Sequence, residues 1–485
     1  MFSPLDRVRD PRSSAALLES LLMCLVNAQI HPTVAAFFNL NRERIILRYC
    51  HLHPSVSEEL LGKYLDYRPK HFHWAGSDLF TVTNAQGTRQ SIIIETNSCP
   101  SGQKSMPLLQ DTEEYGGYKK VIDQFVRMQQ IVPKKWGGLA VIWDKNQMEA
   151  SGYAAVMADL CNEQVYMTPY YDNDADPPVK WVDGIMHVRT ADHEWHPIRA
   201  CFRYVTNAPW KRIPVRTKTL VMNEIVSCLA GGRNKMMAHR AYELFNAELA
   251  GTGLHIKVPE TYTNVPKPDI PLRVQLWGGH AVLKVPYSNA GQGVYTITNS
   301  DELDSFMSTD HHYDKFLVQS LVGNASWSSV GREGLQYHIG NIPDKKGRTY
   351  VSDLRVMVIA SDEEGPGGGF SPVAIYARRA RKPLARHLKD GAESSWDMLG
   401  TNLSVKMEDG SFTTDTNRLL LMDRKDFNAL GISIDDLIES YISTVLSVIA
   451  IDKMACLLVD DKGRFDMELF SALNPDDVLC AEILK

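Results

Sequence analysis

A short apolar run that ends in a lysine and leads into a glycine-bearing loop is the feature that most constrains the fold of this chain. The run is Ala281–Lys284, and a second apolar segment, Val294–Ile297, resumes after the loop. Because a buried strand fixes the backbone, the Lys284 ammonium points toward whatever the loop encloses. Gly291 and Gly293 let backbone N–H groups approach an anion without an intervening Cβ. The pattern predicts a phosphate-holding hairpin, and a plain flexible turn is the alternative.

A strand on both sides of the loop distinguishes this pattern from a Walker P-loop, in which a helix follows the loop. The motif G-x-x-x-x-G-K-[ST] is absent from the sequence, and so is the dinucleotide motif G-x-G-x-x-G. The sequence therefore predicts that any bound phosphate is held by a strand lysine and a hairpin.

Further blocks on both sides of the hairpin carry a common likeness. They are Gly231–Phe245, Leu254–Thr261, Lys315–Gly323, Asp353–Ile359, Tyr376–Arg379 and Gly400–Ser404. Together with the hairpin, these blocks resemble the ATP-grasp superfamily, in which a nucleotide lies between two α+β subdomains under such a loop. The resemblance implies a mixed α+β and α/β protein with an ATP-grasp fold and a small parallel-sheet α/β substrate domain.

The resemblance also implies an ATP site and a catalytic group. The implied ATP-binding residues are Lys235, Lys284, Ser288, Gly291, Gly293, Gln319 and Leu321. The residues implied to stabilise the transferring phosphoryl group and the tetrahedral intermediate are Arg355, Arg379 and Asn402.

The pattern around Arg355 supports such a role independently. Arg355 lies between Leu354 and Val356, so a strand would direct its guanidinium to the face opposite theirs, toward a cleft or solvent. Guanidinium groups bind two phosphate oxygens at once. A surface arginine is the alternative. For the basic run that contains Arg378, Arg379 and Arg381, the alternative is a solvated stretch, and the resemblance favours Arg379.

A nucleotide needs hard cations held by oxygen ligands, and the best match lies early in the chain. Glu95 and Asn97 end an apolar strand and project from one of its faces because they are two residues apart. We expect them to hold Mg²⁺, with Asp78 on the preceding strand as a further ligand.

The order of these motifs resembles circularly permuted ATP-grasp ligases, such as glutathione synthetase of the eukaryotic type. In that group the Glu-x-Asn hairpin precedes the lysines. A second candidate for the metal site remains open: the segment 455–470 is also predicted to be a hairpin, with Glu468 inside it and Asn474 beyond it.

Composition excludes several other classes. The formal net charge of −6 is spread along the sequence, which argues against a nucleic-acid partner. The apolar run Leu17–Val26 is too short to span a bilayer, so no membrane partner is expected. The 8 cysteines have no C-x-x-C spacing, and we expect free thiols in the cytoplasm.

The chain divides into four predicted regions. Residues 1–131 supply N-terminal helices and the Glu-x-Asn hairpin, and residues 132–225 form an α/β substrate-binding domain with a β-α-β unit. Residues 226–425 form the nucleotide-binding subdomains, and residues 426–485 complete the core with a helix and a hairpin.

Three residues are candidates for substrate binding. Ser98 and Ser101 lie beside the expected metal ligands, and Arg203 in the α/β region is a candidate for holding a substrate carboxylate, with a structural role as the alternative.

The resemblance implies an ATP-dependent carboxylate–amine ligase that forms an amide or peptide bond through an acylphosphate. Its partners would be small carboxylate and amine substrates, amino-acid or peptide-like. A phosphotransferase on the same fold and a non-catalytic nucleotide-binding protein are the alternatives. The sequence names neither substrate, and whether the chain forms a homo-oligomer is open.

Overall fold

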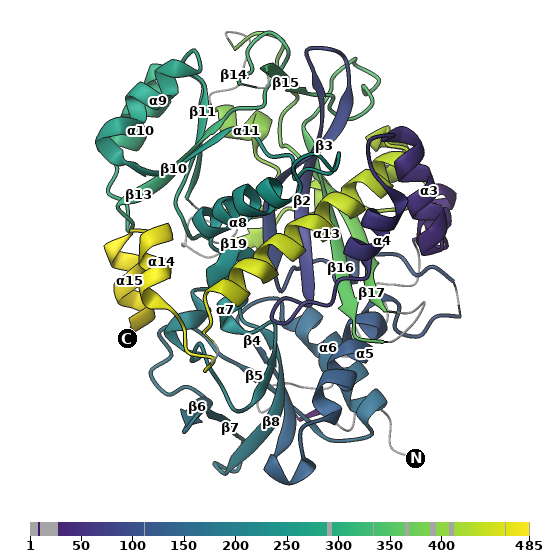
Figure 1. The fold of residues 1–485 in the computed structure, drawn as a ribbon, viewed down its shortest axis with the longest axis vertical. Coiled ribbons are helices and arrows are strands. Elements are labelled where there is room, and N and C mark those ends of the chain that lie inside the picture. Colours follow the sequence, from purple (N-terminus) through teal and green to yellow (C-terminus); the bar gives the residue numbers. More distant parts are fainter. Residues whose placement is uncertain are drawn as a thin grey trace.

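The computed structural model describes residues 8–9, 28–110, 112–288, 293–332, 334–363, 368–388, 394–406, 412–460 and 462–484. Within them, helices pack against antiparallel and mixed sheets, which confirms the expected mixed α+β class. Figure 1 shows these sheets in three parts of the molecule, with one long helix crossing its middle.

The first sheet contains the predicted β-α-β unit. Its strand order is β1-β5-β4-β8-β7-β6, with β9 beside β8. The strands are β1 (Val8–Arg9), β4 (Gly138–Trp143), β5 (Val165–Pro169), β6 (Val179–Val182), β7 (Ile185–Arg189), β8 (Trp195–Tyr204) and β9 (Leu220–Met222). The strand β4 is apolar and buried along its length because it pairs in parallel with both β5 and β8.

Two helices, α5 (Gly117–Gln130) and α6 (Gln147–Cys161), pack together at this sheet. Gly152 permits their close approach, because a Cβ there would lie 2.8 Å from the ring of Tyr118. The carboxyl end of β4 leads directly into the loop before α6, and this loop faces the cavity described below.

The second sheet joins the early hairpin to the middle of the chain. Its order is β14-β15-β2-β16-β17-β20, with β3 paired to β2. The strands are β2 (Trp74–Asn84), β3 (Arg89–Ser98), β14 (Val330–Gly331), β15 (Gly334–His338), β16 (Ser352–Ser361), β17 (Gly369–Arg379) and β20 (Leu419–Leu420). The predicted hairpin around Glu95 is therefore present as β2 and β3, and β16 pairs along the other side of β2.

The third sheet carries the lysine hairpin. It is antiparallel in the order β10-β13-β11-β12. Its strands are β10 (Thr261–Pro266), β11 (Ala281–Lys284), β12 (Val294–Ile297) and β13 (Lys315–Ser320), with α8 (Lys235–Glu248), α9 (Ile270–Leu276) and α10 (Ser300–Ser308) packed nearby. The helix α11 (Ser395–Leu399) and the short pair β18 (Ser404–Lys406) and β19 (Phe412–Thr414) follow in the chain between β17 and β20 of the second sheet.

The long helix α13 (Ile434–Leu457) lies across the middle of the molecule and packs against β3, β16 and α8 (Figure 1). By length and composition its 24 residues could cross a bilayer, but 83% of its most apolar stretch is buried in the protein, as in a core helix. The smaller helices are α2 (Pro32–Phe38), α3 (Arg42–Leu52), α4 (Glu58–Leu65), α7 (Ile225–Ser227), α12 (Asp426–Leu430), α14 (Met467–Leu473) and α15 (Asp477–Leu484).

The predicted late hairpin at 455–470 is wrong. Residues up to Leu457 continue α13, a single bridge joins Val459 to Phe465, and α14 follows. Asp466 starts α14 because its side chain accepts the Leu469 N–H at 2.9 Å, a helix N-cap. Capping chemistry and the buried Phe470 therefore outweigh the strand-like alternation of this segment.

A fully buried carboxylate on α13 fixes the chain at the entry to β2. Asp452 accepts hydrogen bonds from the backbone N–H groups of Lys70, His71 and Phe72 at 2.7–3.0 Å and from the hydroxyl of Tyr67 at 2.8 Å. One side chain thus satisfies donors that would otherwise be buried without partners.

We expect Asp452→Ala to lower the free energy of unfolding by roughly 3–5 kcal/mol, because these donors lose their acceptor inside the core. Urea denaturation measures the change. The control is Asp435→Asn on the same helix, where an exposed pair with Arg48 is lost at a cost below about 1 kcal/mol. Equal stability of the two variants would contradict this account.

Candidate active site

A row of polar residues crosses four strands of the second sheet at one level. Glu95 of β3 lies opposite Asp78 of β2, which lies opposite Arg355 of β16, which lies opposite Tyr376 of β17. Residues directly opposite one another share a face of the sheet. All four line one cavity of about 400 Å³.

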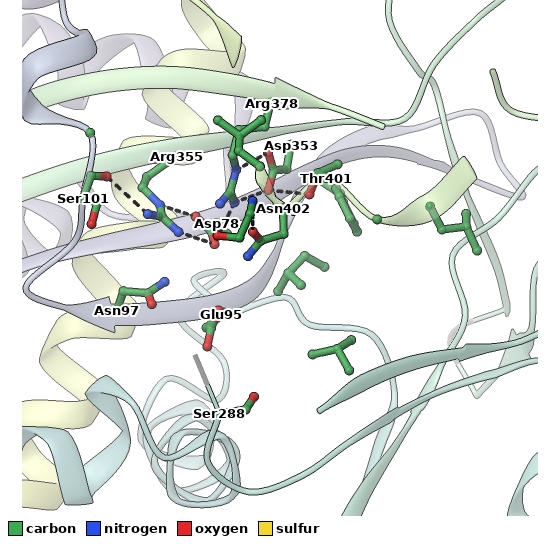
Figure 2. Close-up of a pocket in the computed structure, with 18 of the residues that line it drawn as sticks. Asp78, Glu95, Asn97, Ser101, Ser288, Asp353, Arg355, Arg378, Thr401 and Asn402 are labelled. Carbon is green, nitrogen blue, oxygen red and sulfur yellow. Dashed lines mark hydrogen bonds and ion pairs between the residues drawn. The ribbon is translucent and has the colours of Figure 1, made fainter. Parts of the chain in front are cut away.

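Asp78 is the centre of a buried charge network in this row. Its carboxylate accepts from Arg355 at 2.5 and 2.7 Å and lies 2.9 Å from Arg378, which also pairs with Asp353. Figure 2 shows these four side chains in contact, with the Thr401 hydroxyl donating to Asp353 at 2.9 Å. Both oxygens of Asp78 are thus engaged by guanidinium groups, so it holds the arginines in place instead of standing open as the expected metal ligand.

The two acids of the network titrate in opposite directions. Burial would raise the pKa of Asp78, but Arg355 and Arg378 outweigh it and hold that pKa well below its ordinary value. For Asp353, burial raises the pKa, and the charge of Asp78 adds to this effect against the attraction of Arg378.

The two predicted lysines lie at the same cavity. Lys235 follows Asn234, whose side chain caps α8, and its ammonium lies 3.2 Å from Glu95 and 3.1 Å from the Ser288 hydroxyl. Lys284 ends β11 and donates to the Ile94 carbonyl at 3.3 Å. Burial lowers the pKa of Lys284 to about 8, despite the opposing attraction of Glu95.

Glu95 and Asn97 fit a hard cation. Both line the cavity and offer oxygen ligands from one face of β3, and Figure 2 shows them beside the arginine network. Burial alone would raise the pKa of Glu95, but the attraction of Lys235 and of other cations outweighs this effect. The pKa of Glu95 is therefore below its ordinary value, and the carboxylate is ionised at neutral pH. The buried Asn97 amide nitrogen has no hydrogen-bond partner among the described residues, which is consistent with a side chain that serves a ligand.

An apolar wall accompanies these charges. Phe80, Val282, Leu321, Val322 and Trp396 line the cavity together with the neutral His338, whose pKa burial lowers to about 3. Such a wall suits a planar base, whereas the cations suit phosphates. The predicted linker residues Gln319 and Leu321 are both in the lining, and the Gln319 amide donates to Thr261 at 2.8 Å.

The loop after β3 contributes Ser101 to the lining. The Ser101 carbonyl accepts from Tyr376 at 2.9 Å and from Arg355 at 3.3 Å. The next two residues donate backbone N–H groups to the buried Glu149 of α6 at 2.9–3.1 Å. The loop is thus held by both α6 and the second sheet.

Arg379 does not line the cavity, contrary to the prediction. Arg378 and Arg379 are adjacent in β17, so their side chains leave opposite faces of the sheet. Arg378 faces the cavity, while the Arg379 guanidinium lies over the Tyr350 ring at 5.2 Å. The strand was predicted correctly, but the phase within it was not.

Two of the three predicted substrate-binding residues, Arg203 and Ser98, also lie outside the cavity lining. Arg203 is 1% exposed, and its guanidinium donates to the carbonyls of Asn223 and Val205 and to the Ser98 hydroxyl. Ser98 is fully buried and also contacts Cys228. These side chains join the two sheets internally and do not reach the cavity, so the structural alternative for Arg203 holds.

The remaining predicted residues fall into three groups. Asn402 and Ser288 line the cavity. Gly293 has a φ of +69° and its carbonyl accepts from Val285, so it shapes the hairpin without lining the cavity. Gly291 lies outside the described residues.

The rival metal pair is absent from the cavity lining. Glu468 is exposed on α14, and the buried Asn474 follows that helix. The structure therefore brings the early pair, Glu95 and Asn97, to the lysines, and not the late pair.

Sequence reasoning missed several residues of the lining, namely Lys104, Lys145, Asn146, Glu149, Arg233, Tyr376 and Arg378. One signal was available: Lys145 and Asn146 follow the carboxyl end of a strand in a β-α-β unit, where ligand sites gather.

No protein-family model and no curated protein matches this sequence. Solved structures that are similar to it include a glutathione synthetase-like effector from Globodera pallida, with 9% identity and a TM-score of 0.36 over 76% of this chain and 86% of that one. A RimK domain ATP-grasp protein from Sphaerobacter thermophilus has 14% identity and a TM-score of 0.27, over 49% of this chain and 90% of that one. D-alanyl-alanine synthetase A from Vibrio cholerae has 10% identity and a TM-score of 0.27, over 64% and 98%.

We expect Asp78→Asn to lower the free energy of unfolding at neutral pH by roughly 3–5 kcal/mol, because two buried guanidinium groups lose their shared counter-charge. Since the folded-state pKa of Asp78 lies below its ordinary value of 3.8, this contribution is complete above about pH 4. It is lost as the pH falls through the folded-state pKa.

Urea denaturation of wild type and variant, at neutral pH and at decreasing acid pH, measures the difference. The wild-type advantage should shrink in acid. Glu243→Gln, which removes an exposed pair with Arg240, serves as the control. An advantage that stays constant down to the lowest pH would contradict the assignment to Asp78.

Proposed function

We propose that this protein is an ATP-dependent carboxylate–amine ligase of the ATP-grasp type, which forms an amide through an acylphosphate and releases ADP and phosphate. One observation carries the proposal: Glu95, Lys235, Lys284 and Arg355, from four distant segments, surround a single cavity with an apolar wall. This set combines cations for phosphates, oxygen ligands for a metal and a surface for a base.

Each group has a task in this reaction. Lys235 and Lys284 neutralise phosphate oxygens, and Arg355 and Arg378 stabilise charge on the transferring phosphoryl group. Asp78 and Asp353 keep those two guanidinium groups fixed, so little reorganisation is needed during the reaction. Phosphoryl transfer requires mainly position and charge neutralisation, which fits a cavity rich in cations.

Mg²⁺ is the metal that this donor set suits, with Glu95 and Asn97 as its protein ligands. When bound, the ion would neutralise phosphate charge. Ser101 and the loop it belongs to would border the acid substrate, because this loop contacts both Arg355 and Tyr204 of the first sheet.

A phosphotransferase on the same site is the second candidate, since the same residues serve phosphoryl transfer to a stable product. The discriminator is the amine: a ligase releases ADP steadily only when both acid and amine are present. Thermal-shift titration with MgATP, followed by ADP-release assays over acid and amine pairs, tests both candidates. No stabilisation by MgATP would contradict both.

We expect Lys284→Ala and Glu95→Gln each to lower the rate of ADP release by about a hundredfold or more, with little change in the melting temperature. The reason is that each removes a charge that acts on the phosphates or their metal. Matched controls are Arg240→Ala on the solvent side of α8 and Glu468→Gln on α14, which should keep full activity. Full activity of Lys284→Ala or of Glu95→Gln would remove that residue from the mechanism.

We expect ATP binding to take up protons above about pH 8. Burial holds the pKa of Lys284 at about 8 in the free protein, and a neighbouring triphosphate would raise it. Lys284 would have a higher pKa in the complex than in the free protein. At a pH between these two pKa values, ATP binding therefore takes up as much as about one proton. Calorimetry at about pH 8.5 in buffers of different ionisation enthalpy measures the uptake. Lys284→Arg, always protonated, should show none, and proton release by the wild type would contradict the assignment.

A further inference from the structure

A second centre of positive charge lies in the cavity, apart from the two phosphate-facing lysines. Lys145 lines the cavity on the loop between β4 and α6, and it is only half-buried. It makes no ion pair or side-chain hydrogen bond with any described residue. A lysine that faces a cavity without an ion-pair partner is a position where a ligand can supply one.

The carboxylates nearest to Lys145 are committed to other partners. Asp144 accepts from the backbone N–H groups of Thr206 and Asn207 at 2.9 and 2.7 Å. Glu149 accepts from the backbone of the Ser101 loop. Neither acid is therefore free to turn toward the ammonium without leaving buried donors unpaired.

The charges around Lys145 differ from those around Lys284. Burial lowers the pKa of Lys145 to about 7, with Arg233 and Arg355 acting in the same direction and Asp144 and Glu149 opposing them. Glu95, Lys235 and Asp78 act on Lys284. The cavity thus has two electrostatic centres, and only the one at Lys284 includes the expected metal ligand.

Ser101 supplies a second donor beside Lys145. Its hydroxyl oxygen already accepts from the Asn146 amide at 3.0 Å and from the Tyr204 hydroxyl at 2.8 Å. The hydroxyl hydrogen of Ser101 therefore remains to be donated. An ammonium and a hydroxyl hydrogen on neighbouring segments match the two oxygens of one carboxylate.

We propose that Lys145 and Ser101 bind a second carboxylate of the acid substrate, so that the substrate is a dicarboxylic acid or an amino-acid or peptide acid with two carboxylates. One carboxylate reacts beside the phosphates, and the other is held at Lys145. This inference rests on the proposed ligase function. It also explains why this end of the cavity is cationic although no phosphate is expected there.

The first test needs no turnover. The rate at which each lysine is acetylated by a trace of reagent is measured by mass spectrometry in the presence of an added acid. The acids are compared in pairs at equal ionic strength, one with two carboxylates and one with a single carboxylate: succinate against butyrate, and L-glutamate against L-glutamine. We expect one or both two-carboxylate acids to slow acetylation of Lys145 about fivefold or more relative to their partners. The exposed Lys135 serves as the internal control and should not change. Equal protection by both members of each pair, or none by any, would overturn the proposal.

The second test uses ADP release with the acid that supports turnover. Lys145→Met should raise KM for a two-carboxylate acid about tenfold or more and leave kcat nearly unchanged, and Lys145→Arg should restore KM. A fall in kcat that arginine does not restore would instead make Lys145 a general base, which contradicts the proposal.

The experiments distinguish a failure of the proposed ligase function from a failure of the proposed second-carboxylate site. A wild-type protein that MgATP does not stabilise would remove the ligase function. A wild-type protein that turns over one-carboxylate and two-carboxylate acids equally, with both equally affected by Lys145→Met, would remove only the second-carboxylate site.

Discussion

The pairing of Asp78 with Arg355 is the interaction on which the site depends. It joins a strand from the first hundred residues to one from beyond residue 350, and it sets which faces of both strands line the cavity. A shift of one residue in this register would put Arg355 on the opposite face of the sheet from Asp78 and Glu95, because strand side chains alternate. The buried ion pair costs desolvation, so its value lies in fixing register and arginine position more than in stability.

The local patterns of the sequence predicted most elements around the site. Apolar runs located β11, β12 and β16, and the apolar stretch before Glu95 located β3. The family resemblance assigned the strand-end lysine and the Glu-x-Asn pair to one site, and both line the cavity in the structure. These predictions work because strand periodicity and side-chain chemistry are properties of short segments.

The errors arise where the answer depends on contacts between distant segments. Arg378 and Arg379 are both in β17, and which one faces the cavity depends on the register with β16, which puts Arg378 opposite Asp353. Arg203 looked available for a substrate, but the partners that occupy it come from elsewhere in the chain. The segment 455–470 alternates like a strand, yet it follows a long core helix and begins another at Asp466.

The free site neutralises part of its own charge, and this bears on how a nucleotide would enter it. Lys235 pairs with Glu95 at 3.2 Å, so a cation and an acid that the proposed function assigns to phosphate and metal are partners when neither ligand is present. A triphosphate with its metal would separate them, giving Lys235 a phosphate and Glu95 a cation. Because each group exchanges one charged partner for another, neither is left buried without a counter-charge at either stage. Lys145 has no ion-pair partner among the described residues, so a ligand carboxylate would supply its first such contact, which distinguishes the proposed acid end of the cavity from the proposed nucleotide end.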